Sequence, residues 1–389
     1  MDRSEAINRE AAVKRIAFVL PHLHMGGIEH VVLRLANELD RRRFRPLLFL
    51  RSVEGTLLRE VARDVQVIDG QGRRAMLLAP FLAGSFRREA VDLVYSGTNA
   101  MNLACVLALT LMPHRAKPRL IISEHTSARA YLAGAKARLV RRALVQALYP
   151  RADLLVAPLE TIACDWIDTM ALAGLAYAVA PNPVLASGWR AGADLPNQRQ
   201  SGLVVAAGRL IPDKGFDGLI RAFAAVARGR ADARLTIFGE GPERAKLEAL
   251  VDAEGMAGRI SLPGITDELL HEFARAKVVA VSSRREGFGN VVIEALAAGA
   301  QVVATDCAGP RALLQGLAQG QIVPVGDRHC LATALAERLD YQISPADQIA
   351  AQARAASYGV EQAVAVFARL AERVLVTGPN DKTDGPIKA

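Results

Sequence analysis

Aromatic residues are scarce in this chain of 389 residues, where Phe, Trp and Tyr together make up 5% of the sequence. Proteins that bind single-stranded nucleic acid depend on aromatic side chains that stack against the bases. The chain also has no recognisable nucleic-acid-binding motif. We therefore expect no nucleic acid among its partners.

Cysteine is rare and dispersed. The four cysteines are Cys105, Cys164, Cys307 and Cys330. No C-x-x-C pair or Cys/His cluster has the spacing of a metal site, and no D-x-D sequence stands in a plausible metal position. We therefore expect no metal and no cofactor, and free thiols of the kind found in the reducing cytosol.

Long apolar runs are absent as well. No stretch of 18 apolar residues, the length of a membrane-spanning helix, occurs in the sequence. The run Ala104 to Met112 is shorter and predicts a helix in a domain core. The N-terminal stretch MDRSEAINREAAVKR is polar and charged, unlike a signal peptide. These features predict a cytoplasmic protein.

Length and charge divide the chain into two parts. A chain of 389 residues is longer than a single hydrophobic core usually accommodates, which favours two domains. Residues 1–150 hold 24 Lys and Arg against 13 Asp and Glu, whereas the remainder holds 24 against 27, which gives a net charge of +8. A basic first half suits a partner with phosphates, such as an anionic membrane surface. The equal alternative is a basic surface without such a partner.

Apolar runs of strand length alternate with segments of helical spacing. Strands are predicted at 15–23, 46–50, 65–68, 93–96, 120–123, 154–157 and 177–180, and then at 203–208, 234–238, 278–283 and 301–305. This alternation predicts parallel sheets with helices on both faces. In such sheets ligands bind at the carboxyl ends of the strands.

The stretch 278–309, VVAVSSRREGFGNVVIEALAAGAQVVATDCAG, predicts strand, loop, helix and strand. Glu286 lies in the loop, and Glu294 lies about one turn into the helix, which Asn290 can cap. The helix N-terminus would offer backbone amides to an anion or to sugar oxygens. A carboxylate accepts two hydrogen bonds side by side, which suits a vicinal diol. The alternative is a pair of solvated glutamates beside a helix start.

A second loop, Arg209 to Gly215 with the sequence RLIPDKG, follows the strand 203–208. Its cations, Arg209 and Lys214, suit phosphate, because guanidinium offers a fork of donors and ammonium a point charge. Two exposed cations in a loop are the alternative interpretation.

The pattern E-x7-E enclosing GFGN, together with GRL-x-x-x-KG, resembles the signature of retaining glycosyltransferases of the GT-B fold, group 1 or family 4. The resemblance extends from Gly26 to about Arg373. It implies two Rossmann-like doubly wound domains facing a central cleft, with a C-terminal helix that crosses back to the first domain.

The resemblance also implies roles for these residues. Glu286 and the amides of Phe288 and Gly289 would hold the donor sugar, and Glu294 would hold the ribose hydroxyls. Arg209 and Lys214 would neutralise charge that grows on the leaving diphosphate. The expected donor site comprises Gly26, Gly27, Arg209, Lys214, Gly239, Gly241, Gly264, Glu286, Gly287, Phe288, Gly289, Asn290 and Glu294. The catalytic residues expected from it are His125, Arg209, Lys214 and Glu286.

Three further turns complete the pocket that the resemblance implies. Gly239 and Gly241 belong to a G-x-G-P turn below the nucleotide, and residues 262–266 would line the base. The turn 306–311, DCAGPR, would close over the sugar or the diphosphate. Many relatives have one or two more residues in this last turn.

The first strand ends at a loop that contains Gly26 and Gly27, HMGGIEH. Glycine lets the backbone approach a phosphate closely, and the sequence is not the G-x-G-x-x-G of nicotinamide-binding proteins. By resemblance this loop lies near the donor diphosphate and the acceptor, with His22 and Glu29 on the acceptor side. A tight turn that needs glycine is the alternative.

Glu124, His125 and Thr126 follow the strand 120–123 and form the other acceptor-side group. An imidazole can donate to a sugar hydroxyl or a phosphate near neutral pH. The resembled family has a histidine at the matching strand end that contacts the transferred sugar, which favours His125 among the seven histidines.

Residues 136–151, KARLVRRALVQALYPR, predict a basic amphipathic helix. Its apolar stripe comprises Leu139, Val140, Ala143, Leu144, Ala147 and Leu148. Its basic flank comprises Lys136, Arg138, Arg141 and Arg142. Such a helix can lie on the anionic cytoplasmic face of the inner membrane. The alternative is a helix packed on its own sheet with a solvated basic face.

The sequence therefore predicts a retaining enzyme that moves a hexose or N-acetylhexosamine, with UDP favoured over GDP as carrier, to a lipid-linked or saccharide acceptor. The alternatives are a nucleotide-sugar epimerase of the same fold and a non-catalytic nucleotide-binding partner on the membrane. The expected divisions are an acceptor domain at 1–185, a linker at 186–201, a nucleotide-sugar domain at 202–359, a returning helix at 360–376 and a disordered tail at 377–389.

Overall fold

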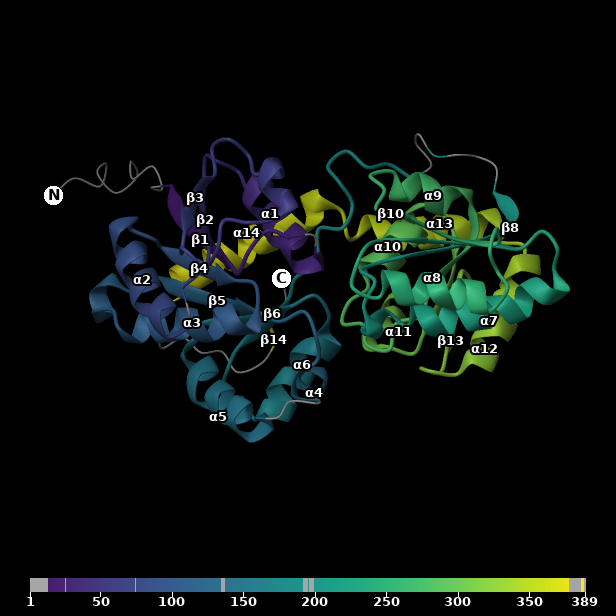
Figure 1. Cartoon of the computed structure of the whole chain (residues 1–389). Coiled ribbons are helices and arrows are strands. Elements are labelled where there is room, and N and C mark those ends of the chain that lie inside the picture. The colour runs from purple at the N-terminus through teal and green to yellow at the C-terminus, as the bar shows by residue number, and fades with distance from the viewer. Residues whose placement is uncertain are drawn as a thin grey trace. The chain divides into compact units, whose positions relative to one another are not determined.

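The computed structural model describes residues 13–24, 26–73, 75–133, 137–191, 195, 199–377 and 386–387. The chain divides into two compact units, Met1–Pro183 with Val360–Ala389 and Val184–Gly359. Each has one parallel sheet with helices packed on it (Figure 1). The prediction of two Rossmann-like α/β domains is confirmed.

The first unit has an eight-stranded sheet in the order β14-β7-β6-β5-β4-β1-β2-β3. The strands are β1 Lys14–Leu20, β2 Phe44–Leu50, β3 Gln66–Asp69, β4 Leu93–Ser96, β5 Arg119–Ser123, β6 Leu154–Ala157, β7 Tyr177–Val179 and β14 Pro386–Ile387. The strand order reverses direction between β1 and β4, so the loops after these two strands flank the place where such sheets bind ligands.

Helices and single 3-10 turns connect these strands. They are α1 Gly27–Glu38, η1 Thr56–Glu60, α2 Ala75–Arg88, α3 Asn99–Thr110, η2 His114–Ala116, α4 Ala128–Leu132, α5 Arg138–Leu148, η3 Tyr149–Arg151, α6 Glu160–Met170 and α14 Val360–Val376. None of the helices in the described residues has the length and hydropathy needed to cross a bilayer.

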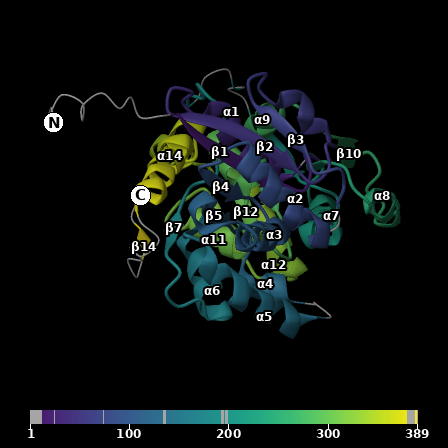
Figure 2. The ribbon, with the colours of Figure 1, turned by 90° about the vertical axis from the view of Figure 1, so that its left-hand side faces the viewer.

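The helix α14 completes the core of the first unit although it lies near the end of the chain. It packs beside α1 (Figure 2). The ring of Phe367 lies 5.6 Å from that of Phe18 on β1 and 5.2 Å from that of Tyr95 on β4, centroid to centroid. All three side chains are buried, so α14 covers apolar surface on the two central strands.

The second unit has a six-stranded sheet in the order β10-β9-β8-β11-β12-β13. Its strands are β8 Gln200–Ala207, β9 Arg234–Phe238, β10 Ile260–Gly264, β11 Ala276–Val281, β12 Gln301–Thr305 and β13 Gly320–Val323. Its helices are η4 Pro212–Lys214, α7 Phe216–Gly229, α8 Arg244–Ala253, α9 Leu269–Arg275, α10 Asn290–Ala297, α11 Ala308–Leu314, α12 Arg328–Asp340 and α13 Pro345–Ala356. Here the strand order reverses between β8 and β11.

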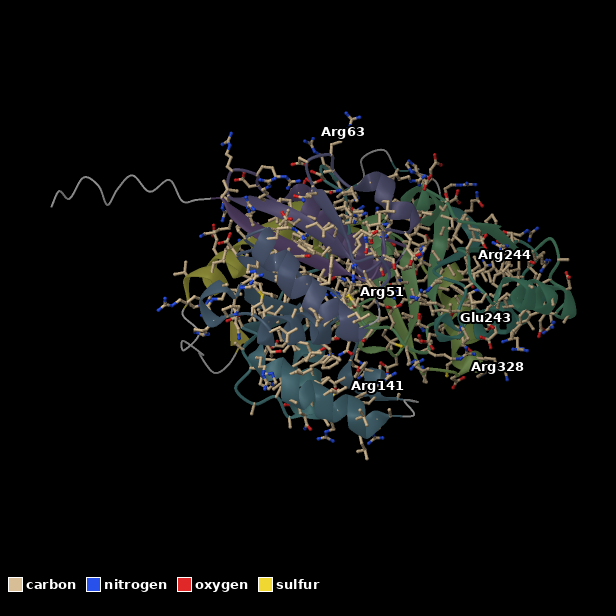
Figure 3. All side chains as sticks on the ribbon, turned by 60° about the vertical axis from the view of Figure 1, so that its left-hand side comes forward. Arg51, Arg63, Arg141, Glu243, Arg244 and Arg328 are labelled. Atoms are coloured by element: carbon tan, nitrogen blue, oxygen red, sulfur yellow. The ribbon has the colours of Figure 1, made fainter. Side chains whose placement is uncertain are left out.

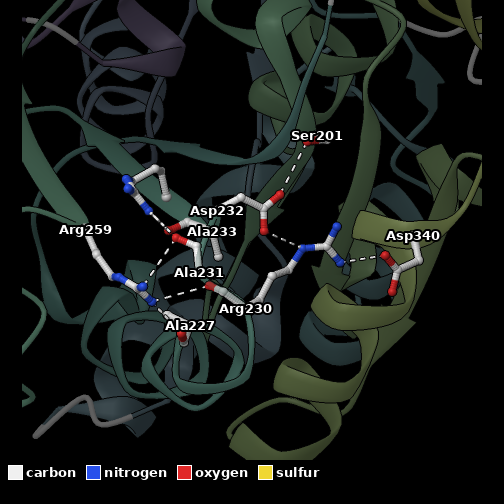
Figure 4. Close-up of polar contacts among 9 residues, drawn as sticks. Ser201, Ala227, Arg230, Ala231, Asp232, Ala233, Arg259 and Asp340 are labelled. Carbon is white, nitrogen blue, oxygen red and sulfur yellow. Dashed lines mark hydrogen bonds and ion pairs between the residues drawn. The ribbon is translucent and has the colours of Figure 1, made fainter.

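Arginines tie the turn between α7 and β9 to its neighbours (Figure 4). Arg230 pairs with Asp232 at 3.1 Å and with Asp340 at the end of α12 at 2.6 Å. Arg259 donates to carbonyl groups of the same turn, and Ser201 Oγ lies 3.3 Å from Asp232 Oδ2. These contacts fix one edge of the second unit.

Several expected boundaries differ from the observed elements. The sequence interpretation missed β10 and β13, whose four or five residues lack a clear apolar run. Residues 186–201, expected as a linker, belong to the second unit, and β8 already begins at Gln200. Of the expected disordered tail, residues 378–385 and 388–389 lie outside the described residues, whereas 386–387 form β14 beside β7.

Candidate functional site

The loops after β8 and β11 meet at the point where the strand order of the second unit reverses. Lys214 Nζ, from the first loop, lies 2.6 Å from Glu286 Oε2, from the second. Both side chains are partly buried, at 24% and 16% exposure. Ser283 Oγ lies 3.4 Å from the same carboxylate oxygen. Two residues separated by 72 positions are thus partners at the carboxyl end of the sheet.

Two arginines that sequence reasoning did not select hold these loops together. Arg284 donates to both carboxylate oxygens of Asp217 at 2.8 and 2.7 Å. Arg285 reaches both oxygens of Asp213 at 2.8 and 2.9 Å. Arg285 contacts its carboxylate through Nε and Nη2, a bidentate arrangement that restrains orientation as well as distance, whereas Arg284 contacts Asp217 through Nη2 alone. The positions of Lys214 and Glu286 are therefore determined by a network and not by their own ion pair alone.

A close backbone approach also fixes the first loop. Gly215 has φ +65°, in the left-handed region, and a Cβ at this position would clash with the carbonyl oxygen of Ser282. Ser282 Oγ donates to the carbonyl oxygen of Lys214 at 2.9 Å. Glycine at 215 is thus required by both conformation and space.

The helix α10 begins one residue away from the expected cap. Gly289, with φ +93°, is the N-cap, and Asn290 is the first helical residue, so the prediction that Asn290 caps the helix is wrong. The left-handed conformation at the cap favours glycine over asparagine. The amides of Phe288 and Gly289 find no backbone acceptor among the described residues. These amides remain at the positive end of α10, where an anion or sugar oxygen would be stabilised.

The DCAGPR turn packs directly on this loop. A Cβ on Gly309 would clash with the carbonyl oxygens of Gly287 and Phe288. Thr305 Oγ1 and Cys307 Sγ both approach the carbonyl oxygen of Ser283, at 2.5 and 3.3 Å. The turn thus supports the loop that bears Glu286 from the side of β12.

The glycines expected below the nucleotide have a structural explanation of their own. A Cβ on Gly239 would clash with Gly208, and one on Gly241 would clash with Leu210. Gly239 N donates to the carbonyl oxygen of Gly264 at 2.8 Å. The three loops after β8, β9 and β10 therefore lie against one another, and these contacts require glycine whether or not a base binds here.

Arg209 and Glu294, two further members of the expected donor site, are not partners in the Lys214–Glu286 ion pair. The Arg209 side chain is exposed and forms no ion pair with any residue in the described ranges. Glu294 lies on α10, half-buried. A cavity of about 460 Å³ lies between the N-termini of α7 and α12, and it is lined by Asp217, Arg221, Arg284 and Arg328. Its lining includes none of the predicted donor-site residues.

In the first unit, Glu124 is the centre of a buried polar network at the end of β5. Its Oε1 accepts hydrogen bonds from Asn102 Nδ2 at 2.9 Å, from Asn99 Nδ2 at 3.4 Å and from the Tyr149 hydroxyl. Glu124 is 4% exposed, and burial raises its pKa to about 7 although the three donors act in the opposite direction.

His125 adjoins this network and is neutral. Burial lowers its pKa to about 4. Its Nε2 lies 3.2 Å from Ser123 Oγ, and a hydrogen bond with the Asn182 side chain acts against the effect of burial on this pKa. A neutral imidazole suits a hydrogen bond to a hydroxyl better than a charged contact with phosphate.

Around the first glycine loop, His22 Nδ1 lies 3.8 Å from Glu29 Oε1. The Glu29 carboxylate covers Gly26, where a Cβ would clash with it. Gly26 itself is extended, at φ −167°, so its backbone does not require glycine. A phosphate at Gly26 would therefore have to displace the Glu29 side chain. Gly27 is the first residue of α1.

Sequence reasoning did not select Asn99, Asn102 and Tyr149. The polar run SGTN after β4 was an available signal, because polar residues at the end of a parallel strand adjoin the ligand edge. Tyr149 gave no such signal. It is fully buried, stacks on Trp166 with ring centroids 5.6 Å apart, and reaches Glu124 from η3. Trp166 Nε1 in turn donates to the carbonyl oxygen of Thr126 at 2.7 Å.

The predicted basic helix is observed as α5, and its apolar stripe points largely to solvent. Leu139, Val140 and Leu144 are 80%, 59% and 45% exposed. The buried residues of α5 are instead Val145 and Leu148. Arg138, Arg141 and Arg142 are exposed, and Arg141 lies over the Tyr131 ring at 5.3 Å (Figure 3). Lys136 lies outside the described residues.

No group of three or more His, Cys, Asp or Glu side chains in the described ranges is arranged to hold a metal ion.

Comparison with known proteins adds two family matches. Residues 201–340 match the family described as Glycosyl transferases group 1, and residues 25–185 match the one described as Glycosyltransferase Family 4.

Three curated proteins illustrate the similarity. An exopolysaccharide phosphotransferase of Streptomyces coelicolor is 36% identical over 129 residues, which cover 33% of this chain and 14% of that protein. The lipopolysaccharide core biosynthesis glycosyltransferase LpsE of Rhizobium meliloti is 32% identical over 143 residues, 37% of this chain and 41% of that protein. The chain thus spans less than half the length of these two relatives. An N-acetylgalactosamine-N,N'-diacetylbacillosaminyl-diphospho-undecaprenol 4-alpha-N-acetylgalactosaminyltransferase of Campylobacter jejuni is 28% identical over 279 residues, 68% of this chain and 72% of that protein.

Solved structures agree on the fold. HepE of Anabaena, in complex with UDP, superposes with a TM-score of 0.74 at 21% identity, covering 93% of this chain and 100% of that one. WaaG, a glycosyltransferase involved in lipopolysaccharide biosynthesis, superposes with a TM-score of 0.68 at 19% identity, covering 93% and 100%.

Proposed function

The chain belongs to the group 1, family 4 glycosyltransferases of the GT-B fold, and we propose that it transfers a hexose or N-acetylhexosamine from a nucleotide sugar with retention of configuration. The acceptor is lipid-linked or a saccharide, and the product is an intermediate of cell-surface polysaccharide assembly. The observation on which this rests is the contact between Lys214 and Glu286 at the point where the second sheet reverses its strand order.

That contact suits a donor with a charged leaving group. As the glycosidic bond breaks, negative charge collects on the diphosphate, and a fixed ammonium stabilises it. Glu286 can accept hydrogen bonds from two sugar hydroxyls, and the amides at the start of α10 can donate to sugar or phosphate oxygens. Arg209, exposed on the neighbouring loop, adds a second cation. Glu294 on α10 is assigned to the ribose hydroxyls by the family pattern.

UDP is the proposed nucleotide. The structural relative HepE was solved with UDP, and the Campylobacter relative is named as an N-acetylgalactosaminyltransferase acting on a diphospho-undecaprenol. The same name supports a lipid-linked acceptor, and LpsE supports a role in glycan assembly. GDP is the competing nucleotide. The three relatives have transferase names, which gives no support to the epimerase alternative.

We propose retention on the basis of the family pattern, in which the leaving diphosphate helps to deprotonate an acceptor that attacks from the same face. In this scheme the chain supplies positioning and charge stabilisation, and it needs no metal ion. His125, neutral at neutral pH, contributes a hydrogen bond to a hydroxyl of the transferred sugar.

Peripheral contact with an anionic membrane on the cytoplasmic side is part of the proposal. The helix α5 presents three exposed apolar side chains beside Arg138 and Arg142. An apolar patch with a basic border suits the headgroup region of an anionic leaflet. A lipid-linked acceptor would be collected from such a surface.

The experiment that tests the proposed function is a panel of UDP, GDP, ADP and CMP sugars incubated with the protein and octyl glycoside acceptors, with release of the nucleoside diphosphate, or of CMP from a CMP sugar, as the readout. Turnover with a UDP sugar and an α-linked product from an α-linked donor, seen by NMR, would support it. If only a GDP sugar is a substrate, GDP replaces UDP as the nucleotide of the donor. A product with inverted configuration would overturn retention.

A further inference from the structure

The carboxylate of Glu124 has two oxygens in very different surroundings. Oε1 receives all three donors, from Asn99, Asn102 and Tyr149. Oε2 accepts no hydrogen bond from any residue within the described ranges. Three side-chain oxygens of this region are fully buried and unpaired: Ser96 Oγ, Thr98 Oγ1 and Asn102 Oδ1. Glu124 Oε2 is not one of them, so this unpaired oxygen retains some contact with solvent. One oxygen is thus anchored and the other is available.

A purely structural role would not require a carboxyl group. The donors on Oε1 are amides and a hydroxyl, and a glutamine oxygen would accept from them equally well. No cation among the described residues forms an ion pair with Glu124. A carboxylate that is 4% exposed without a countercharge is costly, which indicates a partner for its second oxygen.

The surrounding contacts hold this carboxyl group rigidly. Glu124 N donates to Val156 O at 2.9 Å, and Asn102 Nδ2 donates to Ser123 O at 3.0 Å. Tyr149 is clamped by Trp166 and by Asn99 Nδ2, which lies 2.6 Å from its hydroxyl. The unpaired atoms Thr98 Oγ1 and Asn102 Oδ1 lie on the first turns of α3, beside the same strand end. The site therefore offers acceptor atoms for hydroxyl groups in a fixed arrangement.

We propose that Glu124 binds the saccharide acceptor, with Oε2 accepting a hydrogen bond from one of its hydroxyl groups while Oε1 stays anchored in the first unit. This inference rests on the proposed function and adds to it a residue that selects for a hydroxyl-bearing acceptor. No proton transfer is assigned to Glu124. It binds the hydroxyl in its ionised form, so protonation weakens acceptor binding.

Acceptor binding should therefore depend on pH. Burial places the pKa of Glu124 at about 7, so binding improves from pH 6 to pH 8. The other titratable groups facing it are Tyr149 and Tyr131, with Arg141 over the Tyr131 ring, and the adjacent His125. None of them titrates between pH 6 and pH 8, because the tyrosine pKa values are raised above 10 and that of His125 lies at about 4.

The test uses release of UDP from a UDP sugar in two arms, with water as the only acceptor and with octyl glycosides of glucose, galactose and N-acetylglucosamine. For Glu124→Gln we expect the acceptor KM to rise about 10- to 100-fold, from the loss of one hydrogen bond to a charged group, and a smaller change in the water arm. The wild-type increase in acceptor affinity from pH 6 to pH 8 should vanish in this variant. Tyr149→Phe should move the midpoint of this pH dependence to higher pH, because the variant loses a hydrogen-bond donor that lowers the pKa of Glu124.

Glu89→Gln, between α2 and β4 at the opposite edge of the sheet, is the matched control and should leave both arms unchanged. An acceptor KM that stays at the wild-type value in Glu124→Gln would overturn the inference, as would a parallel loss in both arms. Stimulation of wild type by none of the glycosides would also count against it. Failure of the proposed function would give a different result, because the wild type would then release no UDP in either arm.

Discussion

Lys214 Nζ and Glu286 Oε2 lie 2.6 Å apart, so the cation and the carboxylate assigned to the donor are each other's partners. A diphosphate that approaches Lys214 competes with Glu286 for the ammonium, and sugar hydroxyls that approach Glu286 compete with Lys214. Donor binding at this place therefore exchanges one set of charge-assisted hydrogen bonds for another. The ion pairs of Arg284 with Asp217 and of Arg285 with Asp213 keep the loops in position during this exchange.

Lys214→Ala should lower kcat by about 10²- to 10³-fold, the usual effect of removing one group that stabilises charge in the transition state. The melting temperature should change little, because other ion pairs hold the loop. Lys246→Ala is the matched control, since Lys246 pairs with Glu243 at 2.9 Å on the surface of α8. Wild-type turnover in Lys214→Ala would sink the assignment of the donor site.

Glu294→Ala should lose stabilisation by the nucleotide. A ligand at about 100 times its Kd stabilises the wild type by about 2.7 kcal/mol, which a thermal-shift assay detects. The panel is UDP, GDP, ADP and CMP, and Glu248→Ala, on α8, serves as control. If a nucleotide still raises the melting temperature of Glu294→Ala as it does that of the wild type, Glu294 does not bind the ribose.

Gly309→Ala should impair donor binding through the backbone. Its Cβ would clash with two carbonyl oxygens of the loop that bears Glu286, and backbone atoms cannot move aside as a flexible side chain can. We expect a KM for the donor raised by an order of magnitude or more and a lower melting temperature. Gly218→Ala meets open space in α7 and should stabilise by about 0.5–1 kcal/mol. Equal effects of the two substitutions would contradict the close packing at Gly309.

Glu124 and His125 should give opposite pH dependences of stability. The pKa of Glu124 rises from 4.5 to about 7 on folding, so its contribution is present below pH 4.5 and is lost as pH rises to about 7. The pKa of His125 falls from 6.5 to about 4, so its contribution is present above pH 6.5 and is lost as pH falls to about 4. In the wild type the two slopes offset each other.

Urea unfolding of the single variants between pH 4.5 and pH 7 separates these contributions. His125→Gln should lose up to about 3 kcal/mol across this range, because only the Glu124 slope remains. Glu124→Gln should instead gain stability as pH rises. Parallel profiles for both variants would show that these side chains are not buried as described.

The exposed helix α5 should bind anionic vesicles. Replacing Arg138, Arg141 and Arg142 by Gln should weaken sedimentation with phosphatidylglycerol liposomes in low salt, by about 1 kcal/mol for each cation. Leu139→Ser with Val140→Ser should weaken it at all salt concentrations, since an apolar contact is not screened. Gln at Arg42, Arg59 and Arg63, exposed elsewhere in the first unit, removes the same charge and is the control. Equal binding by all of these proteins would remove the membrane contact.

The repeating strands and helices could be predicted from the sequence, because each buried strand is a continuous apolar run in a parallel sheet. Glu286 and Lys214 could each be predicted as donor-site residues, because each belongs to a motif whose spacing lies within a single loop. Their contact across 72 positions depends on which strands are neighbours, and no local pattern states that order.

The remaining differences have the same origin. Tyr149 reaches Glu124 from a different element, so its role depends on tertiary packing. The cap at Gly289 depends on a positive φ imposed by the loop, which side-chain preferences at Asn290 do not reveal. In α5 the apolar spacing identified a helix correctly but not its buried face, because Leu139 and Val140 lie beyond the part that the rest of the unit covers.

The return of α14 to the first unit has a consequence for synthesis on the ribosome. The central strands β1 and β4 leave the ribosome early, but Phe367, which covers Phe18 and Tyr95, is made after the whole second unit. A nascent chain that ends at residue 359 would hold a complete second unit and an open first unit with apolar surface exposed. Folding of the first unit can thus finish only after translation has passed α14, and truncations before this helix should aggregate.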